Sequence, residues 1–288
     1  MNQQEKCLWL IRALLDEMPQ YRDTPIPALP DHRWRLLRSL MNVRPPMPTT
    51  KEFLQVQDAY LRQMTTEKGI VDVASLPSSA KDERLILWQG DITTLQCDAI
   101  VNAANSQMLG CFSPCHGCID NIIHTMAGVQ LRLACHEIMQ KQGHEEPTGQ
   151  AKITPGFNLP AKYVLHTVGP IIDDEVTTAD EALLTSCYQS CLELAAQKGL
   201  RSVAFCCIST GVFRFPPERA AEIAIQTIRA CLRQDAAIQR VVFTRITRPE
   251  RFNNVRKMAP DNVNAYLSDL NGKRHSTTAE MLRQLGIK

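Results

Sequence analysis

LILWQGDITTLQCDAIVNAAN, residues 85–105, contains two short apolar runs, and each of them ends in small or polar residues. The first run ends in Gly90-Asp91, and the second ends in the amide-containing stretch VNAAN. Runs of this length, bounded by such residues, predict buried strands. We therefore expect two core strands here, each of which delivers a polar loop.

Strands and helices alternate through the second half of the chain. Helical patterns cover about 119–142, 179–197 and 217–233, and the strand patterns are KYVLHTVG, SVAFCCI and RVVFTRI. This alternation predicts an α/β fold whose sheet is covered on both faces. Because an open α/β sheet binds its ligand at strand ends, the expected ligand-binding loops are WQGD, VNAAN and CISTGVF.

The two ends of the chain have a different texture. Residues up to about 75 alternate helical patterns with proline-rich breaks such as PIPALPDH and RPPMPTT, which predicts a small helical appendage. The last 40 residues are polar with a helical pattern, so we expect a helical tail. The predicted domains are a helical N-terminal extension at 1–78 and an α/β domain with its tail at 79–288.

The composition is that of an ordinary globular chain of 288 residues, 44% of them hydrophobic. A net charge of +2 offers no basic surface for a phosphate backbone, so nucleic acid is not an expected partner. No apolar stretch approaches the roughly 20 residues of a membrane span, and the acidic, amphipathic start is unlike a signal peptide. Eleven cysteines without such a signal indicate reduced thiols or metal ligands. We expect no membrane partner and a cytoplasmic location, with the mitochondrion as second choice.

The densest chemical signal is LGCFSPCHGCIDN, residues 109–121, which brings together Cys111, Cys115, His116 and Cys118. Thiolates and an imidazole suit zinc, and three protein ligands leave one position open, as catalytic sites do. By spacing, Cys111, His116 and Cys118 form one workable set, and all four residues form another. A redox-active Cys-x-x-Cys pair or cysteines that serve as small buried hydrophobes are the alternatives.

Four motifs resemble the macrodomain signature in order and spacing: GDIT at 90–93, DAIVNAAN at 98–105, CIDNIIHTMAG at 118–128 and ISTGVFRFP at 208–216. The resemblance covers about 80–245 and implies a three-layer α/β/α sandwich with a mixed central sheet. GCFSPCHGCIDN, with the upstream YLRQMTTEKGIVDVASLP, looks like the zinc-dependent macrodomains of microbial protein-ADP-ribose hydrolases. The implied ligand is ADP-ribose, and the implied cofactor is Zn²⁺.

The resemblance also implies roles around the reacting ribose. The implied zinc ligands are Cys111, His116 and Cys118. Asp120 takes the position of an aspartate that helps to activate water. Asn105 would hold the distal ribose hydroxyls, because one amide offers both a donor and an acceptor. Asp120 and Asn105 are thus the expected catalytic residues.

At the other end of the ligand, Asp91 would accept a hydrogen bond from the adenine amino group and Ile92 would contact the ring through its backbone. An aspartate after a strand often only caps the next turn, which is the alternative for Asp91. Backbone N–H groups would wrap the diphosphate. The implied segment is Ser209, Thr210, Gly211, Val212 and Phe213, with the ring of Phe213 over the distal ribose.

The remaining polar residues of these motifs receive structural roles. We expect Asn102 to pin the loop backbone and Cys115 to be a neighbour of the zinc ligands. His124 and His166 lie in apolar patterns and are expected to be structural histidines whose hydrogen bonds are satisfied.

The implied reaction is hydrolysis of the bond between C1 of the distal ribose and a protein side chain. Zinc would activate water, hold the ribose, or do both. The implied substrate is a mono-ADP-ribosylated protein, and a lipoyl-carrier protein is a plausible one because such hydrolases often accompany a sirtuin-like transferase and that carrier. The alternatives are a reader domain that binds ADP-ribose around a structural zinc, and a redox or zinc-scaffold protein.

Overall fold

The computed structural model describes residues 1–245, and the helical tail expected after them lies outside the described residues. The apolar runs form a six-stranded sheet in the order β2-β8-β7-β4-β6-β5. Its strands are Leu85–Gln89 (β2), Ala99–Ala104 (β4), Ala151–Pro155 (β5), Tyr163–Val168 (β6), Ser202–Phe205 (β7) and Arg240–Arg245 (β8). Only β5 is antiparallel to its neighbour, so the sheet is mixed.

The chain reverses its progress across the sheet at β4. After β4 it builds β5 and β6 on one side, and it then returns to place β7 and β8 on the other side. Because β4 and β7 are parallel neighbours, the loops that follow them leave adjacent strand ends. Such a switch point is where open α/β sheets bind ligands.

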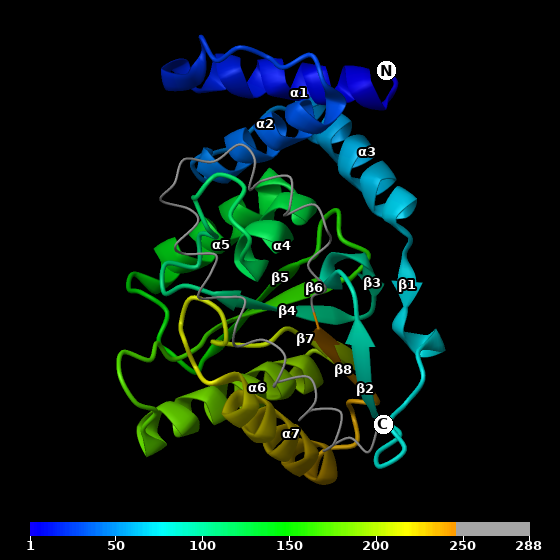
Figure 1. Ribbon diagram of the computed structural model, residues 1–288, viewed down its shortest axis with the longest axis vertical. Coiled ribbons are helices and arrows are strands. Elements are labelled where there is room, and N and C mark those ends of the chain that lie inside the picture. Colours follow the sequence, from blue (N-terminus) through cyan, green and yellow to red (C-terminus); the bar gives the residue numbers. More distant parts are fainter. Residues whose placement is uncertain (246–288) are drawn as a thin grey trace.

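Helices cover both faces of the sheet (Figure 1). Ile119–Ala127 (α4) and Val129–Gln142 (α5) lie on one face, and Thr178–Gln197 (α6) and Pro217–Gln234 (α7) lie on the other. Sequence signals set the starts of two helices: Thr177 and Asp180 form a capping box before α6, and α7 has proline in its first turn. The predicted three-layer sandwich with a mixed sheet is confirmed.

Two local features differ from the expectation. The single helix expected at about 119–142 is divided at Gly128, whose φ of 97° lies in a region that an α-helix does not use. Strand β5 falls in a segment to which no element was assigned. The short elements are Pro19–Tyr21 (η1), Val71–Asp72 (β1), Val73–Ser75 (η2), Ile92–Thr94 (η3) and Leu95–Gln96 (β3).

The N-terminal region forms three helices, Gln3–Glu17 (α1), Pro30–Val43 (α2) and Lys51–Lys68 (α3). Their apolar faces enclose a core of their own that includes Leu10, Leu14, Leu37 and Leu61. The helices stack outside α4 and α5 as an additional layer (Figure 1). Among the helices of residues 1–245, none combines the length and the apolar character needed to cross a membrane.

Buried polar contacts join this layer to the sheet domain. The guanidinium of Arg132 on α5 donates to the main-chain oxygens of Met41, Asn42 and Arg44, where α2 ends. These oxygens would otherwise be unpaired carbonyls of a helix end. The same guanidinium donates to the carbonyl of Leu109, in the loop after β4, at 2.7 Å. The side chain of Arg132 therefore links the end of α2 to the loop that carries the cysteines.

Candidate active site

The Cys/His loop, which we define as residues 105–118, runs from the end of β4 to the start of α4. Ligand atoms of Cys111, His116 and Cys118 all lie within 4.8 Å of one another, and the three residues are half-buried. The Cys111 Sγ and His116 Nδ1 atoms are 3.6 Å apart. Two ligands of a tetrahedral zinc ion, at ordinary Zn–S and Zn–N lengths, are separated by about 3.5 Å. The donor set and its spacing thus fit zinc.

Hydrogen bonds among the three side chains shift their pKa values. Hydrogen bonds with Cys118 and with His116 together lower the pKa of Cys111 to about 4, against the effect of burial. The same sharing of a proton raises the pKa of Cys118. Hydrogen bonding to Cys111 raises the pKa of His116. A thiolate is the form of cysteine that binds metals, so Cys111 is prepared for that role at neutral pH.

Cys115 stands apart from these three residues. Its thiol faces α2, where it lies 3.4 Å from the Arg35 carbonyl and 3.3 Å from the Ser39 hydroxyl. Its backbone adopts a φ of 54°, and its N–H donates to Asn42 Oδ1 at 2.9 Å. These contacts anchor the tip of the loop to the N-terminal helices and favour the set of three ligands over the set of four.

Asp120 lies in the first turn of α4, directly after the loop, and is 5% exposed. Burial raises the pKa of its carboxyl group to about 7, although a hydrogen bond from Asn102 opposes the shift. Asn102 Nδ2 donates to Asp120 Oδ1 at 2.8 Å. Within residues 1–245, Asp120 Oδ2 accepts no hydrogen bond. The carboxylate is therefore held by one oxygen and retains the other for a water or a ribose hydroxyl.

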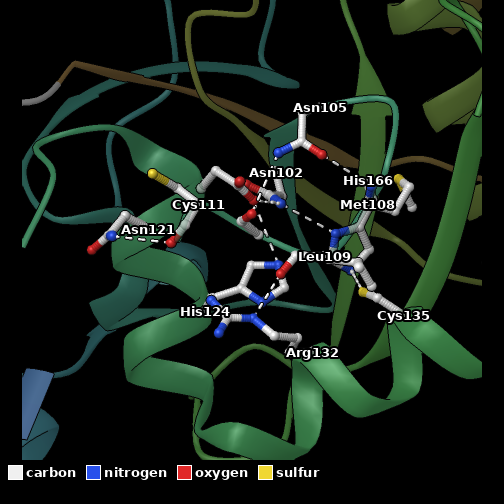
Figure 2. Close-up of polar contacts among 12 residues, drawn as sticks. Asn102, Asn105, Met108, Leu109, Cys111, Asn121, His124, Arg132, Cys135 and His166 are labelled. Atoms are coloured by element: carbon white, nitrogen blue, oxygen red, sulfur yellow. Dashed lines mark hydrogen bonds and ion pairs between the residues drawn. The ribbon is translucent and has the colours of Figure 1, made fainter. Parts of the chain in front are cut away.

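The expectation that Asn102 pins the loop backbone is wrong. Its side chain points instead into a buried cluster, where it also contacts His166 Nδ1 at 3.2 Å (Figure 2). The strand register explains this contact, because Asn102 on β4 lies directly opposite His166 on β6 and both side chains project to one face. Asn105 does hold the loop backbone: its Oδ1 accepts from the N–H groups of Gln107 and Met108.

The two histidines differ from each other. His166 is satisfied as expected, since its Nε2 lies 2.9 Å from the Thr154 hydroxyl and 3.8 Å from Cys135 Sγ. Burial lowers the pKa of His166 to about 3, so its ring is neutral. Neither ring nitrogen of His124 has a hydrogen-bond partner in the described part of the chain, although its Nε2 lies 3.5 Å from Asp120 Oδ1. The expectation of satisfied hydrogen bonds therefore fails for His124.

At the far end of the site, Asp91 caps the short helix η3. Its Oδ1 accepts from the N–H and the hydroxyl of Thr93, and its Oδ2 pairs with Lys68 of α3 at 3.1 Å. This ion pair and the bonds from Thr93 lower the pKa of Asp91 against the effect of burial. Asp91 therefore caps this turn, and its carboxylate also remains ionised and partly exposed as an acceptor. The side chain of Ile92 is buried, which leaves its backbone as the available contact.

The loop after β7 carries the segment 209–213 beside the end of β4. Ser209 is buried with a φ of 62°, and within the described chain its hydroxyl has no hydrogen-bond partner. A Cβ added at Gly211 would meet no atom within 4 Å, so open space adjoins this backbone. The side chain of Val212 is 55% exposed and Phe213 is half-buried. The segment thus offers backbone N–H groups and two apolar side chains to a ligand.

Several residues of this site were not identified from sequence. Lys68, Arg38, Asn121 and Arg132 all contact site residues or the Cys/His loop. Figure 2 shows Asn121 beside Cys111, and Arg132 beside Leu109. Asn121 stands next to Asp120 in a quoted motif, and Lys68 lies in the quoted stretch YLRQMTTEKGIVDVASLP, whereas Arg38 and Arg132 lie on helices outside the quoted stretches.

The sequence matches the Macro domain family over residues 101–224. A protein-ADP-ribose hydrolase of Treponema medium is 57% identical over 245 residues, which are 84% of this chain and 94% of that protein. A protein-ADP-ribose hydrolase of Staphylococcus aureus strain MRSA252 is 49% identical, over 82% of this chain and 90% of that protein.

A solved structure is also similar. The macrodomain of Trypanosoma brucei in complex with ADP-ribose is 30% identical, with a TM-score of 0.56, over 76% of this chain and 94% of that one. This chain thus resembles these proteins in sequence, and it resembles the Trypanosoma brucei macrodomain in fold as well.

Proposed function

The chain belongs to the macrodomain family, and from that premise we propose that it is a hydrolase that removes mono-ADP-ribose from modified protein side chains with the help of zinc. One observation carries the proposal: three zinc-type ligands meet in the loop after β4, a strand that is a parallel neighbour of β7. The relatives named protein-ADP-ribose hydrolase support the reaction. The macrodomain with ADP-ribose supports the ligand.

ADP-ribose would be recognised by loops that follow several strands of the sheet. The ionised carboxylate of Asp91 is available to accept from the adenine amino group, with Ile92 as backbone contact. Backbone N–H groups of the segment 209–213, next to the open space at Gly211, would bind the diphosphate. Phe213 would cover the distal ribose. Most of the binding energy would then arise far from the bond that breaks, and would position C1 at the Cys/His loop.

Cys111, His116 and Cys118 would hold the zinc ion at the reacting ribose. When bound there, zinc supplies Lewis acidity that stabilises negative charge developing on oxygen. Asp120 Oδ2 would orient the attacking water, and Asn105 would hold the ribose hydroxyls. Water adds to C1, the bond from C1 to the side-chain oxygen or nitrogen breaks, and the proton of water is transferred to the leaving side chain.

The finer assignments rest on the resemblance. We propose a lipoyl-carrier protein as the modified substrate, because related hydrolases accompany that carrier. We also propose a cytoplasmic location.

The second candidate function is a reader that binds ADP-ribose without cleaving it, around a structural zinc. The open space at Gly211 suits either function, but the free oxygen of a buried Asp120 beside the loop favours turnover.

Release of ADP-ribose from a mono-ADP-ribosylated protein, measured beside calorimetric ADP-ribose binding, separates the two functions. The wild-type chain should release ADP-ribose, and Cys118→Ala should lose zinc and release while it still binds ADP-ribose. A wild-type chain that binds ADP-ribose but releases none would support the reader. A Cys118→Ala variant that retains full release without bound zinc would overturn the metal assignment.

A further inference from the structure

Arg38 is one of the residues of α2 that attach the Cys/His loop to the N-terminal helices. Arg38, on the face of α2 that meets the loop, donates from Nη2 to the His116 carbonyl at 2.8 Å. The same guanidinium donates to Asn121 Oδ1 from Nη2 at 2.6 Å and from Nε at 3.2 Å. The guanidinium of Arg38 thus contacts two residues of the site: His116, which is a proposed zinc ligand, and Asn121.

Asn121 extends this contact to the other two ligands. It is fully buried, and its Nδ2 donates to the carbonyls of Cys111 and Ser113 at 3.3 and 2.9 Å. Its backbone N–H donates to Cys118 Sγ at 3.4 Å. Each of the three ligand residues is therefore connected to the pair formed by Arg38 and Asn121, through a carbonyl or through sulfur.

We propose that Arg38 is a positioning residue for the zinc ligands, which makes helix α2 a part of the active site. This inference rests on the proposed function, because it assumes that the Cys/His loop binds zinc. Residues that hydrogen-bond to ligand residues orient them, and their removal commonly weakens metal binding by about 10- to 100-fold. Arg38 acts on the backbone of His116 and on the side chain of Asn121, and it touches no reacting atom.

The chemistry of arginine suits this position. A planar guanidinium presents several N–H donors in a fixed arrangement, so it can hold two acceptors at once. Its positive charge lies near the sulfur atoms of Cys111, Cys115 and Cys118. Lysine would keep the charge but offer a single donor group on a flexible stem. A substitution by lysine therefore tests the planar set of donors while it keeps the charge, and a substitution by glutamine removes the charge.

The loss of Arg38 alone should leave the N-terminal helices in place. Asn42 donates to the Thr125 hydroxyl at 3.0 Å, and Gln57 Oε1 accepts from the backbone of Val129 at 2.9 Å. Asn158 donates to Asp58 at 2.7 Å, and Arg132 holds the end of α2. These contacts are independent of Arg38, so a substitution there changes the loop before it changes the fold.

Zinc affinity of the full chain, measured by competition with a chromophoric chelator, tests the inference. Arg38→Gln and Arg38→Lys should both bind zinc about 10- to 100-fold more weakly than the wild type. With cobalt(II) in place of zinc, the visible spectrum of both variants should differ from that of the wild type. ADP-ribose affinity should stay close to the wild-type value. Arg33→Gln is the matched control, because Arg33 lies on the same helix but donates to the Pro27 carbonyl, away from the loop.

Three results would overturn the inference. If Arg38→Gln binds zinc as tightly as the wild type, with the same cobalt spectrum, Arg38 does not position the ligands. If Arg33→Gln weakens zinc binding equally, the effect belongs to the helix as a whole. If the wild-type chain binds no zinc, the metal assignment of the proposed function fails, and this inference fails with it. A normal zinc affinity in the wild type and in Arg38→Gln would leave the proposed function intact.

Discussion

The two ends of the candidate site are built differently. At the adenine end, Asp91 is positioned by the next turn of its own loop, through the N–H and hydroxyl of Thr93. At the ribose end, the Cys/His loop is held by Arg38 and Asn42, which precede it by about 75 residues in the chain. Asp91 is thus positioned by its own turn, with one ion pair to Lys68 of α3, whereas the loop of the proposed metal ligands is held by several contacts with α2.

This difference suggests a division between affinity and turnover. Contacts at the adenine end are far from the bond that breaks, so they should contribute equally to substrate and transition-state binding. In the proposed reaction, charge develops beside the Cys/His loop, so its proposed ligands should act on the reaction rather than on affinity. Substitutions at the two ends should therefore separate kcat from the dissociation constant.

The largest expected effect is at the metal ligands. Cys111→Ala removes a ligand whose pKa is already low, so zinc should be lost and kcat should fall at least about 100-fold. Cys115→Ala is the matched variant in the same loop, and it should retain zinc, because its thiol faces α2. Metal analysis and release kinetics of both variants measure the effect. Loss of zinc from Cys115→Ala would show that the set has four ligands.

The second-largest effect is expected on the free energy of unfolding, at the buried residues Asn102 and His166. His166 has a pKa of about 3 when folded, whereas an unfolded histidine titrates near 6.5, so the unfolded chain alone takes up a proton as the pH falls. The free energy of unfolding of the wild type should therefore decrease, between pH 7 and 5, by about 2 kcal/mol more than that of His166→Gln. The difference between the two proteins cancels the titration of Asp120 and His124. Urea unfolding at both pH values measures it, and parallel pH dependences would refute a neutral buried His166.

The smallest of the three effects is expected at the adenine end. Asp91→Ala removes an ionised acceptor, so ADP-ribose affinity should fall about 10-fold, since a hydrogen bond to a charged group contributes roughly 1.5 kcal/mol. The kcat should remain close to the wild-type value. Lys68→Met, which removes the ion pair but keeps the carboxylate, should weaken binding less. Calorimetry and steady-state kinetics distinguish these outcomes, and a fall in kcat with unchanged affinity would contradict the division between the two ends.

Much of the fold was predictable because its signals are local. Apolar runs identified β2, β4, β6, β7 and β8, and helical patterns identified α6 and α7. The break at Gly128 was missed because the periodicity continues on both sides of it. Strand β5 was missed because the segment Ala151–Pro155 is short and contains lysine and proline.

The candidate site was predictable only in part. Spacing alone did not decide whether the Cys/His loop has three or four metal ligands. The resemblance selected the set of three, which the geometry also favours. The position of Asn102 follows from pairing with β6, and a strand register is not visible in one sequence. The contact of Arg38 with His116 spans 78 residues, so no local pattern could indicate it.

The most direct test of a catalytic zinc at the ribose end is to follow release and binding on one preparation as the metal is removed. The wild-type chain is treated with a chelator, freed of it, and then supplied with zinc. Release of ADP-ribose from a mono-ADP-ribosylated protein should fall at least about 100-fold without the metal and return with zinc, while calorimetric ADP-ribose affinity stays nearly constant. Undiminished release from a chain shown by metal analysis to hold no zinc would contradict the account.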